Sequence, residues 1–519
     1  MKKNKYLFIP VQPTPNGRLH IGHISGPYLK SDVLARNLRM LGHDVSIISG
    51  VDTFEAHVCL KAVQEGETPE AVNDKYHGLM VKDLEALDIR FDQYINPLDA
   101  DHRRPFEDMH LALYNALVDA GRIEWCREKF FKRDDGRVLN GCWIRGQCSR
   151  CDQPMKGFYC EECGANLRPE QIVNPYFVPS LAAGESVAEV EDRCAYLRVD
   201  PERLKHAWRK MQLPARFIEI AESFLEPQAR VRMTTPDRWG IRVDAAEAQE
   251  EQVLFSYTTL FFYAVYCAEL YARAVAAPVH PFEPASEVIT VASFGVDNTN
   301  AYLVGVMGAA YGLGLKPFDH YLTNYFFQLD HKKIASSSGH AIWAEDLVVQ
   351  HGFPADAARM FILSVNPQHG PSNFTLAACT AFHREVYVGS LLAKCELALA
   401  RCERRLSKTV DSLVKARLHV AFARQQACFA LPRSDLKAAT DELLGWLAFF
   451  DEVEAAGAGL GDWLLGLALL SHAIAPTVSA HLRSSLGLSE PQILLRCDLL
   501  DCTARHQQPS RSSLLDAEP

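Results

Sequence analysis

The stretch KYLFIPVQPTPNGRLHIGH, residues 5–23, joins an apolar, β-rich run to a turn with proline and glycine and then to the start of a helix. Residues 5–11 predict a strand, and the apolar residues between positions 21 and 41 recur at spacings that share one face of a helix. Gly42 ends this predicted helix, and residues 44–49 predict a second strand. Strand, turn, helix and strand in this order form a βαβ unit, which implies a parallel sheet.

Residues 13–23 of the same stretch, PTPNGRLHIGH, have the features of an anion site. The unpaired N–H groups and the dipole at a helix N-terminus favour phosphate. His20 and His23 lie on one face of the first helical turn, and Gly22 between them leaves room for a nucleotide. Two imidazoles there can stabilise charge that develops on a phosphate during displacement at phosphorus. By spacing alone, an ordinary helix start with two chance histidines explains the pattern equally well.

A second motif, KKIASSSG at residues 332–339, follows a strand predicted at residues 326–328. A loop with lysine and small hydroxyl residues can hold a polyphosphate and can move during a reaction. Taken alone, the motif is better explained as a solvated surface loop. The two motifs, however, stand on either side of an α/β pattern that is interrupted and resumes at residues 288–292 (VITVA). This arrangement favours a shared nucleotide site.

Four cysteines form two CxxC pairs, Cys148 with Cys151 and Cys160 with Cys163. Two such pairs separated by eight residues can fold as knuckles that place four thiolates tetrahedrally around zinc. A redox pair or an empty knuckle is the alternative. Because all four ligands would be protein thiolates, the zinc expected here is structural rather than catalytic.

The composition is that of an ordinary globular protein, with 48% hydrophobic and 23% charged residues among 519. A net charge of −10 argues against a protein coated in basic charge for indiscriminate nucleic-acid binding, although a local basic patch is compatible with it. We find no apolar run that predicts a membrane span, and the start, MKKNKYLFIP, does not resemble a signal peptide. We therefore expect a cytoplasmic protein with reduced cysteines.

The two motifs carry a family resemblance. The turn Asn16-Gly17 with His20 and His23 resembles the HIGH signature of class I aminoacyl-tRNA synthetases, and residues 333–337 (KIASS) are similar to their KMSKS signature. Further segments resemble the methionyl branch: residues 41–45 (LGHDV), Asp52, residues 60–62 (LKA), residues 234–241 (TTPDRWGI), Gly295 and Asp297. The resemblance covers most of residues 5–400 and is weaker beyond them.

This resemblance implies an α/β fold, in which a Rossmann-type parallel sheet is split by a zinc-knuckle insertion and followed by a C-terminal α-helical bundle. Helical patterns at residues 391–406, 413–431, 434–454 and 463–486 agree with the bundle. The expected parts are the first half of the catalytic domain (1–120), a connective insertion with the knuckle (121–233), the second half of the catalytic domain (234–345), a linker or stem-contact region (346–375), a helical domain like those that bind anticodons (376–500) and a flexible tail (501–519).

The resemblance also implies a reaction and the residues that carry it. An amino-acid carboxylate attacks the α-phosphorus of ATP, with Mg²⁺ assisting, and the aminoacyl group then passes to an acceptor, which is expected to be a tRNA. His20 and His23 would stabilise the transition state. Lys333 would neutralise the leaving phosphate, and Asp52 would anchor the substrate ammonium. The implied ATP-binding residues are Asn16, His20, Gly22, His23, Gly295, Asp297, Lys333 and Ile334, and the implied cofactors are ATP, Mg²⁺ and a structural Zn²⁺.

The side-chain pocket departs from the methionyl pattern. Where the family has leucine, tyrosine, tryptophan, tyrosine and histidine, this chain has Gln12, Thr14, Tyr257, Ala264 and Tyr302. A buried glutamine needs a hydrogen-bond partner, and a methionine thioether is a poor one. Asp52 is retained, so an α-amino acid other than methionine is expected. The signature loop departs as well, because Ser336 stands where the family has a second lysine.

The helical region also departs from the family. Methionyl enzymes read the anticodon with an asparagine and an arginine one turn apart and a later tryptophan, whereas residues 394–400 read KCELALA and residues 450–459 contain no tryptophan. A basic cluster could contact phosphate or could simply be a solvated helix end. Its members are Arg401, Arg404, Arg405 and Lys408.

Three other functions are compatible with parts of the pattern. A paralogue would keep the activation step and supply an activated amino acid, or an aminoacyl-tRNA, to a biosynthetic or modifying pathway without reading an anticodon. A non-catalytic sensor of an amino acid or of RNA would not need the histidine pair, Lys333 and Asp52 together. A nucleotidyltransferase that makes a coenzyme shares the histidine signature, but it needs neither a zinc insertion nor a long helical C-terminus.

Overall fold

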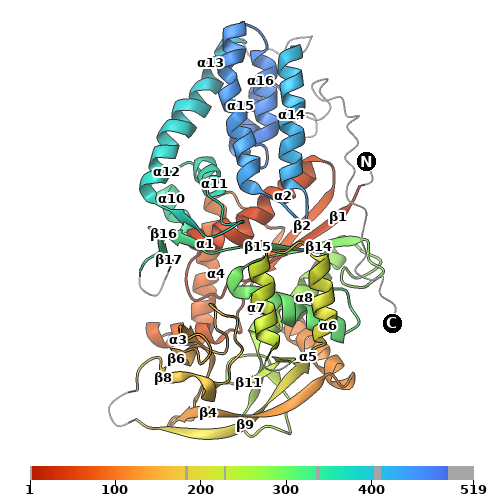
Figure 1. Ribbon diagram of the computed structural model, residues 1–519, viewed down its shortest axis with the longest axis vertical. Helices are drawn as coiled ribbons and strands as arrows, with labels where there is room; N and C mark the ends of the chain where they lie inside the picture. Colours follow the sequence, from red (N-terminus) through yellow and green to blue (C-terminus); the bar gives the residue numbers. More distant parts are fainter. Residues whose placement is uncertain (1–2, 182–184, 227–228, 335–338, 403–410, 489–519) are drawn as a thin grey trace.

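The computed structural model describes residues 3–181, 185–226, 229–334, 339–402 and 411–488. Figure 1 shows three parts stacked along the long axis: a helical bundle, a parallel sheet with its helices, and an antiparallel insertion at the opposite end. The predicted tail, residues 501–519, lies outside the described residues. None of the helices in the described part of the chain has the length and apolar character that a membrane span requires.

One five-stranded sheet joins the early and late parts of the α/β pattern. Its strands pair in parallel in the order β15-β14-β1-β2-β3. Successive side chains of these strands point to opposite faces of the sheet, and helices bury both faces, as is usual for a parallel sheet. The predicted single sheet is therefore confirmed. The strands are β1 (Lys5–Pro10), β2 (Asp44–Gly50), β3 (Gln93–Ile95), β14 (Val288–Gly295) and β15 (His320–Asn324).

The helix predicted at residues 21–41 is not continuous. It consists of α1 (Ile21–His23), a π-helical turn (Ile24–Tyr28) and α2 (Leu29–Met40). Gly26 has non-helical backbone angles, φ −86° and ψ −107°, and Pro27 follows it without an N–H to donate. A Cβ on Gly26 would lie 2.6 Å from the Asn324 side chain, so this close approach to β15 requires glycine. The prediction of one regular helix was wrong, because the spacing of apolar residues in the sequence does not reveal a π-helical turn.

The insertion is built on a long antiparallel pair, β4 (Ile123–Arg133) and β9 (Val187–Arg198). Arg232 and Glu128 form a buried ion pair, and Glu128 also accepts a hydrogen bond from the Tyr196 hydroxyl. These contacts join neighbouring strands of the sheet. A smaller sheet in the order β7-β6-β8 carries the cysteine pairs. The segment near residues 202–225 forms two helices. The further elements are β5 (Val138–Leu139), β6 (Ile144–Gln147), β7 (Pro154–Lys156), β8 (Val173–Phe177), α6 (Pro201–Lys210), α7 (Ala215–Leu225) and β10 (Arg230–Arg232).

Shorter elements surround the parallel sheet and connect it to the bundle. Those around the sheet are α3 (Ala56–Glu65), α4 (Pro69–Ala86), α5 (Arg103–Asp119), β11 (Thr234–Pro236), β12 (Arg242–Val243), β13 (Gln252–Leu254), α8 (Leu260–Ala274), α9 (Met307–Gly312), β16 (Phe327–Leu329), β17 (Lys332–Lys333), α10 (Ala344–Val349), α11 (Ala355–Ser364) and β18 (Ser372–Phe374). The helical part has α12 (Leu376–Phe382), a π-helical stretch (His383–Leu392), α13 (Ala393–Arg401), α14 (Ser412–Phe429), α15 (Leu436–Ala456), α16 (Leu460–Ser471) and α17 (Pro476–Ser485).

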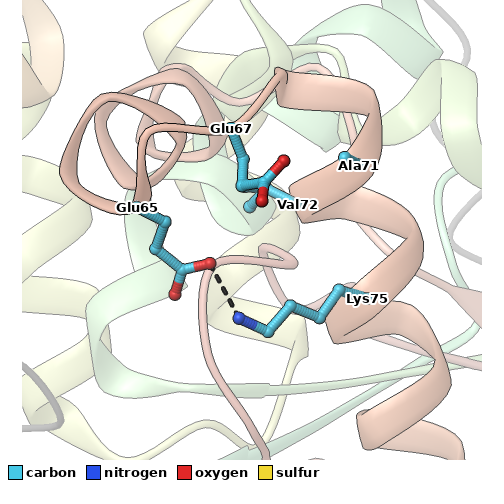
Figure 2. A pocket seen from close by; sticks show the side chains of 5 residues that line it. All are labelled: Glu65, Glu67, Ala71, Val72 and Lys75. Atoms are coloured by element: carbon cyan, nitrogen blue, oxygen red, sulfur yellow. Dashed lines mark hydrogen bonds and ion pairs between the residues drawn. The ribbon is translucent and has the colours of Figure 1, made fainter.

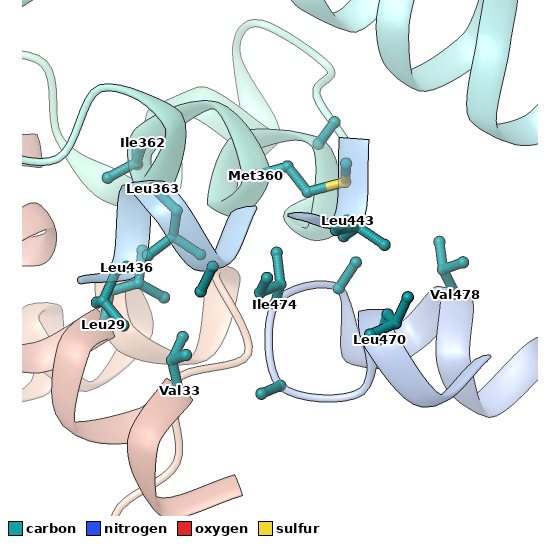
Figure 3. Packing of buried hydrophobic residues seen from close by; sticks show 14 of the residues in the cluster. Leu29, Val33, Met360, Ile362, Leu363, Leu436, Leu443, Leu470, Ile474 and Val478 are labelled. Carbon is teal, nitrogen blue, oxygen red and sulfur yellow. The ribbon is translucent and has the colours of Figure 1, made fainter. Parts of the chain in front are cut away.

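The bundle shares its hydrophobic core with the sheet's helices. Figure 3 shows Leu29 and Val33 of α2 facing side chains of α11, α15 and the α16–α17 region. Apolar burial of this kind contributes about 25 cal/mol per Å² and has no directional preference. It holds the parts together but does not fix their orientation.

A buried arginine supplies that orientation. Arg359 on α11 is fully buried and pairs with Asp32 of α2 at 2.8 Å. The same guanidinium donates to the carbonyls of residues 87 and 88 and of residues 473 and 474, at 3.0–3.2 Å. One planar group with five fixed donors therefore joins the sheet unit, α11 and the helical bundle.

Arg359→Met is expected to lower the free energy of unfolding by about 3–5 kcal/mol, because it takes away one of the two arginines that pair with buried Asp32, leaving Arg36, and removes the hydrogen bonds to four backbone carbonyls. Urea denaturation measures the change. Arg384→Met is the matched control, since Arg384 is 73% exposed and pairs with its exposed neighbour Glu385. A loss below 1 kcal/mol for Arg359→Met would show that the parts do not depend on this contact.

Candidate active site

The two sequence motifs meet at the carboxyl edge of the parallel sheet. His20 forms an antiparallel bridge with Trp343, and the flanking amides complete it: Ile21 N donates to Ile342 O and Ala344 N to Leu19 O, both at 3.0 Å. Gly22 lies against Ile334, because a Cβ on this glycine would be 3.2 Å from the isoleucine Cδ1 and 3.0 Å from the His20 ring. The histidine turn and the lysine loop are thus neighbours despite their separation in the chain.

Arg18 stabilises the contact between these two segments through ion pairs. Its guanidinium contacts Asp83 at 2.7 Å, Glu345 at 2.8 Å and Asp346 at 3.0 Å. Asp83 also accepts from the backbone N–H groups of Leu19 and Glu345, each at 3.0 Å. The loop before the histidines is therefore tied to α4 and to α10 by charge-assisted hydrogen bonds.

The histidine rings are held as neutral N–H donors. His20 caps its helix: its Nδ1 accepts from Gly22 N at 3.1 Å and from His23 N at 3.4 Å, while His23 Nδ1 accepts from His20 N at 3.3 Å. An Nδ1 that accepts a hydrogen bond leaves the ring proton on Nε2. Burial lowers the pKa of His23 to about 4, and burial together with His23 lowers the pKa of His20 well below its usual value. At neutral pH both Nε2–H groups are available to an anion.

Asp52 follows β2, and its own N–H donates to Pro13 O at 2.9 Å. Burial, with a further contribution from the charge of Glu55, raises the pKa of Asp52 to about 8, and a hydrogen bond from the Ser256 side chain opposes the rise. Glu55 is itself committed to His57, whose backbone N–H donates to it at 2.6 Å. In the described part of the chain, no cation is among the groups that shift the pKa of Asp52.

The predicted pocket residues lie in different environments. Gln12 is buried with its Oε1 unpaired among the described residues, and Thr14 is half-buried. Tyr302 is buried and stacks flat on Phe294, with ring centroids 4.3 Å apart. Ala264 is buried within α8.

The other residues predicted to bind ATP lie at the end of β14 and in the turn before the histidines. A Cβ on Gly295 would lie 2.6 Å from Asp297 Oδ1, so a larger residue there would displace the Asp297 carboxylate. The Tyr257 hydroxyl donates to the Asp297 carbonyl at 2.8 Å, which joins a predicted pocket residue to a predicted ATP residue. Asn16 is half-buried in the turn, where its N–H donates to Thr14 O at 2.8 Å.

Lys333 ends the short strand β17, and its side chain is exposed. Its Nζ forms an ion pair with Glu161 of the cysteine knuckle and lies 4.4 Å from the centroid of the Phe326 ring. Ser336, the predicted departure in this loop, falls outside the described residues.

Sequence reasoning missed Tyr263 and Glu161. The Tyr263 hydroxyl is buried and unpaired among the described residues, and a Cβ on Gly50 would lie 2.5 Å from it. Tyr263 stands in the aromatic run LFFYAVY, where no pattern distinguishes the ring that faces β2. Glu161 lies between Cys160 and Cys163, and the metal-binding motif explains this stretch of sequence without assigning a role to the glutamate.

The four knuckle sulfurs are arranged for a metal. They lie within 4.8 Å of one another, and the distances between Cys148 and Cys163 and between Cys151 and Cys160 are 3.7 and 3.6 Å. A tetrahedron with Zn–S bonds of about 2.3 Å has edges of about 3.8 Å. The geometry therefore fits a tetrahedral thiolate site.

A hollow between α3 and α4 is unrelated to this edge. Figure 2 shows that Glu65, Glu67, Ala71, Val72 and Lys75 line it, and a dashed line joins Glu65 to Lys75. This ion pair, 2.8 Å long, neutralises the charges that a ligand would need. None of the motif residues reaches the hollow.

Comparison with known proteins places these observations in a family. The model of the tRNA synthetases class I (M) matches residues 11–386. The methionine–tRNA ligase of Christiangramia forsetii is 27% identical over 387 residues, which are 72% of this chain and 55% of that protein. The methionine–tRNA ligase of Thermoplasma volcanium is 26% identical over 377 residues, 70% of this chain and 67% of that protein. The chain thus spans about half to two thirds of the length of these curated relatives.

Solved structures share the fold. Mycobacterium tuberculosis methionyl-tRNA synthetase bound by methionyl-adenylate has a TM-score of 0.72 with 17% identity, covering 94% of this chain and 95% of that one. The free form of that enzyme has a TM-score of 0.65 with 15% identity, covering 95% and 94%. The likeness extends over the helical part, which the family match does not reach.

Asp52→Asn is expected to stabilise the folded chain at alkaline pH. Because the pKa of Asp52 is raised to about 8, the native carboxyl keeps a proton that the unfolded chain releases near pH 4. The free energy of unfolding of the parent therefore falls as the pH rises from 4 to 8, and the asparagine variant escapes this loss. Urea denaturation at pH 8.5 should show a gain of at least about 1 kcal/mol.

At pH 4.5 the same substitution should change the free energy of unfolding little. Asp101→Asn, at an exposed position, controls for the removal of one charge. A variant at Asp52 that is less stable than the parent at pH 8.5 would contradict the burial argument.

Proposed function

Because the chain belongs to the class I tRNA synthetases, we propose that it activates an amino acid with ATP and transfers the aminoacyl group to a tRNA. One observation carries the proposal: His20 and His23 follow β1 and Asp52 follows β2 at one sheet edge, and the loop that begins at Lys333 reaches Gly22 through Ile334. A protein that only senses an amino acid or RNA has no use for this combination.

Each step of the activation has a group to support it. The amino-acid carboxylate attacks the α-phosphorus of ATP, the bond to the β-phosphate oxygen breaks, and pyrophosphate leaves. The Nε2–H groups of His20 and His23 donate to oxygens that gain charge in the transition state. Lys333 is placed to neutralise the departing phosphates, and Asp52 to hold the substrate ammonium. Magnesium would arrive with ATP and would help to neutralise the charge of its phosphates.

Binding of the substrate ammonium also explains why the chain keeps Asp52, although a buried, unpaired carboxylate lowers the stability of the folded protein. An unpaired buried carboxyl prefers its neutral form, as its raised pKa records. A cationic substrate restores the carboxylate, so the protein carries a local instability that the substrate relieves.

We propose that Cys148, Cys151, Cys160 and Cys163 hold one structural Zn²⁺. The sulfur spacing supports tetrahedral thiolate coordination, and four protein ligands leave no position for water or substrate. When bound, the ion would fix the knuckle's backbone.

Freshly purified protein is expected to contain one zinc per chain by elemental analysis. Cys148→Ser should lower the zinc content by more than half, because three thiolates bind zinc more weakly than four. Cys428→Ser is the control, since this cysteine on α14 lies outside the tetrad, and it should leave the content unchanged. Protein without stoichiometric zinc would refute the assignment.

We further propose that the favoured amino acid has a polar side chain and is not methionine. Gln12 Oε1 and the Tyr263 hydroxyl are buried without partners among the described residues. A site of this kind favours a substrate that hydrogen-bonds to it, because an apolar substrate leaves its polar groups unpaired.

The helical bundle supports a departure from methionine tRNA recognition. Lys394, on the helix where the family reads the anticodon, donates to Leu447 O and pairs with Asp451, both at 3.0 Å. Arg401 pairs with Glu454 at 2.9 Å, while Arg404, Arg405 and Lys408 of the predicted basic cluster lie outside the described residues. Charges engaged within the bundle are less available to RNA. A role in a biosynthetic or modifying pathway agrees with this observation.

ATP–pyrophosphate exchange with each amino acid is expected to show the highest kcat/KM for a polar one. Gln12→Leu should lower that kcat/KM by roughly 10- to 100-fold, since an unpaired group costs about 1–3 kcal/mol. Gln350→Leu, at an exposed position, is the matched control. His20→Ala should lower exchange roughly 10²–10³-fold with every amino acid, which ties the reaction to this site.

Methionine as the best substrate, together with charging of both initiator and elongator methionine tRNAs, would contradict the specificity and leave a divergent methionyl enzyme. Exchange that persists at the parent rate in His20→Ala would contradict the mechanism.

A further inference from the structure

The cysteine knuckle, residues 148–164, is docked against the nucleotide side of the sheet edge. Tyr159 stacks on Tyr257, with ring centroids 4.8 Å apart. Asn300 Nδ2 donates to Gly164 O at 3.3 Å. The knuckle therefore borders the candidate active site directly.

The far side of the knuckle rests on α7. Gly164 has a φ of +78°, and a Cβ on it would lie 2.6 Å from Ile220 O, so only glycine fits this packing. Backbone hydrogen bonds from Gly164 N to Cys160 O, at 2.9 Å, and from Cys160 N to Ala165 O, at 3.0 Å, close the turn. The residue after Cys160 is consequently held at a fixed place.

That residue is Glu161, and it binds the lysine of the signature loop. Its Oε2 forms the ion pair with Lys333 Nζ, while its Oε1 lies 3.7 Å from Lys156 Nζ. Glu161 is 29% exposed and Lys333 is 54% exposed, so the pair is partly screened by water. A screened pair of this kind is worth about 0.2–1 kcal/mol, which is small enough for a ligand to break.

We propose that Glu161 is a positioning residue that competes with ATP for Lys333. The inference rests on the proposed function, because that function assigns Lys333 to the ATP phosphates. A carboxylate beside the phosphate-binding ammonium lowers the positive potential that attracts phosphate. ATP binding must therefore open the Glu161–Lys333 pair, and the knuckle sets the affinity for ATP through one side chain.

Glu161→Gln tests the competition. The variant should bind α,β-methylene ATP, which cannot be cleaved between its α- and β-phosphates, roughly 2- to 5-fold more tightly by titration calorimetry. The KM for ATP in pyrophosphate exchange should fall equally, with kcat within twofold of the parent. A purely structural role for Glu161 would instead lower kcat or the zinc content. Glu162→Gln removes the same charge from an exposed neighbour in the same turn and should leave the ATP affinity unchanged.

A double-mutant cycle with Lys333→Met identifies the partner. If Glu161 acts through Lys333, adding Glu161→Gln to Lys333→Met should change analogue binding by less than twofold. An equal gain in both backgrounds would mean direct repulsion of phosphate, and weaker binding by Glu161→Gln would mean that Glu161 presents Lys333 productively. Either result overturns the proposal. A failure of the proposed function is distinguishable, because the parent would then show no exchange with any amino acid.

Discussion

The antiparallel contact between residues 19–21 and 342–344, secured by Arg18, is the constraint on which the site depends. A parallel sheet delivers the ends of β1, β2 and β14 to one edge, where the first N–H groups of the helix that follows β1 are already bonded to Ile342 O and to His20 Nδ1. The lysine loop comes from a different part of the chain and has no strand in this sheet. The bridge and the ion pairs of Arg18 with Glu345 and Asp346 tie residues 19–21 to residues 342–346, and Ile334 beside Gly22 brings the start of the loop to the same place.

Part of this architecture follows from local rules and was predictable. The βαβ start at residues 5–49 determined a parallel sheet, and the CxxC spacing placed four sulfurs together. The features that sequence did not reveal are those set by contacts between distant segments. The π-helical turn at Gly26 exists because β15 approaches it, and Tyr263 matters because Gly50 leaves room for its hydroxyl. Glu161 gains its role only after folding brings the knuckle to Lys333. Spacing along the chain does not encode such contacts.

In the proposed function, specificity and acceptor choice reside in different parts of the molecule, and the sequence departs from the methionyl pattern in both parts. Gln12 and Tyr263 bring polar groups to a place where an apolar side chain would leave them unpaired. In the bundle, Lys394 and Arg401 are engaged by α15, which fits a helix that serves packing more than RNA. Arg359 nevertheless keeps the bundle in a fixed relation to the sheet, so the overall fold survives the change in surface chemistry.

The most direct measurement is the identity of the adenylate that the protein makes. The purified chain is incubated with ATP, Mg²⁺ and an equimolar mixture of the twenty amino acids, and the bound product is identified by mass spectrometry after rapid separation. The account predicts an aminoacyl-adenylate of a polar amino acid, formed by the parent and not by His20→Ala. Methionyl-adenylate as the main product, or no adenylate at all, would contradict it.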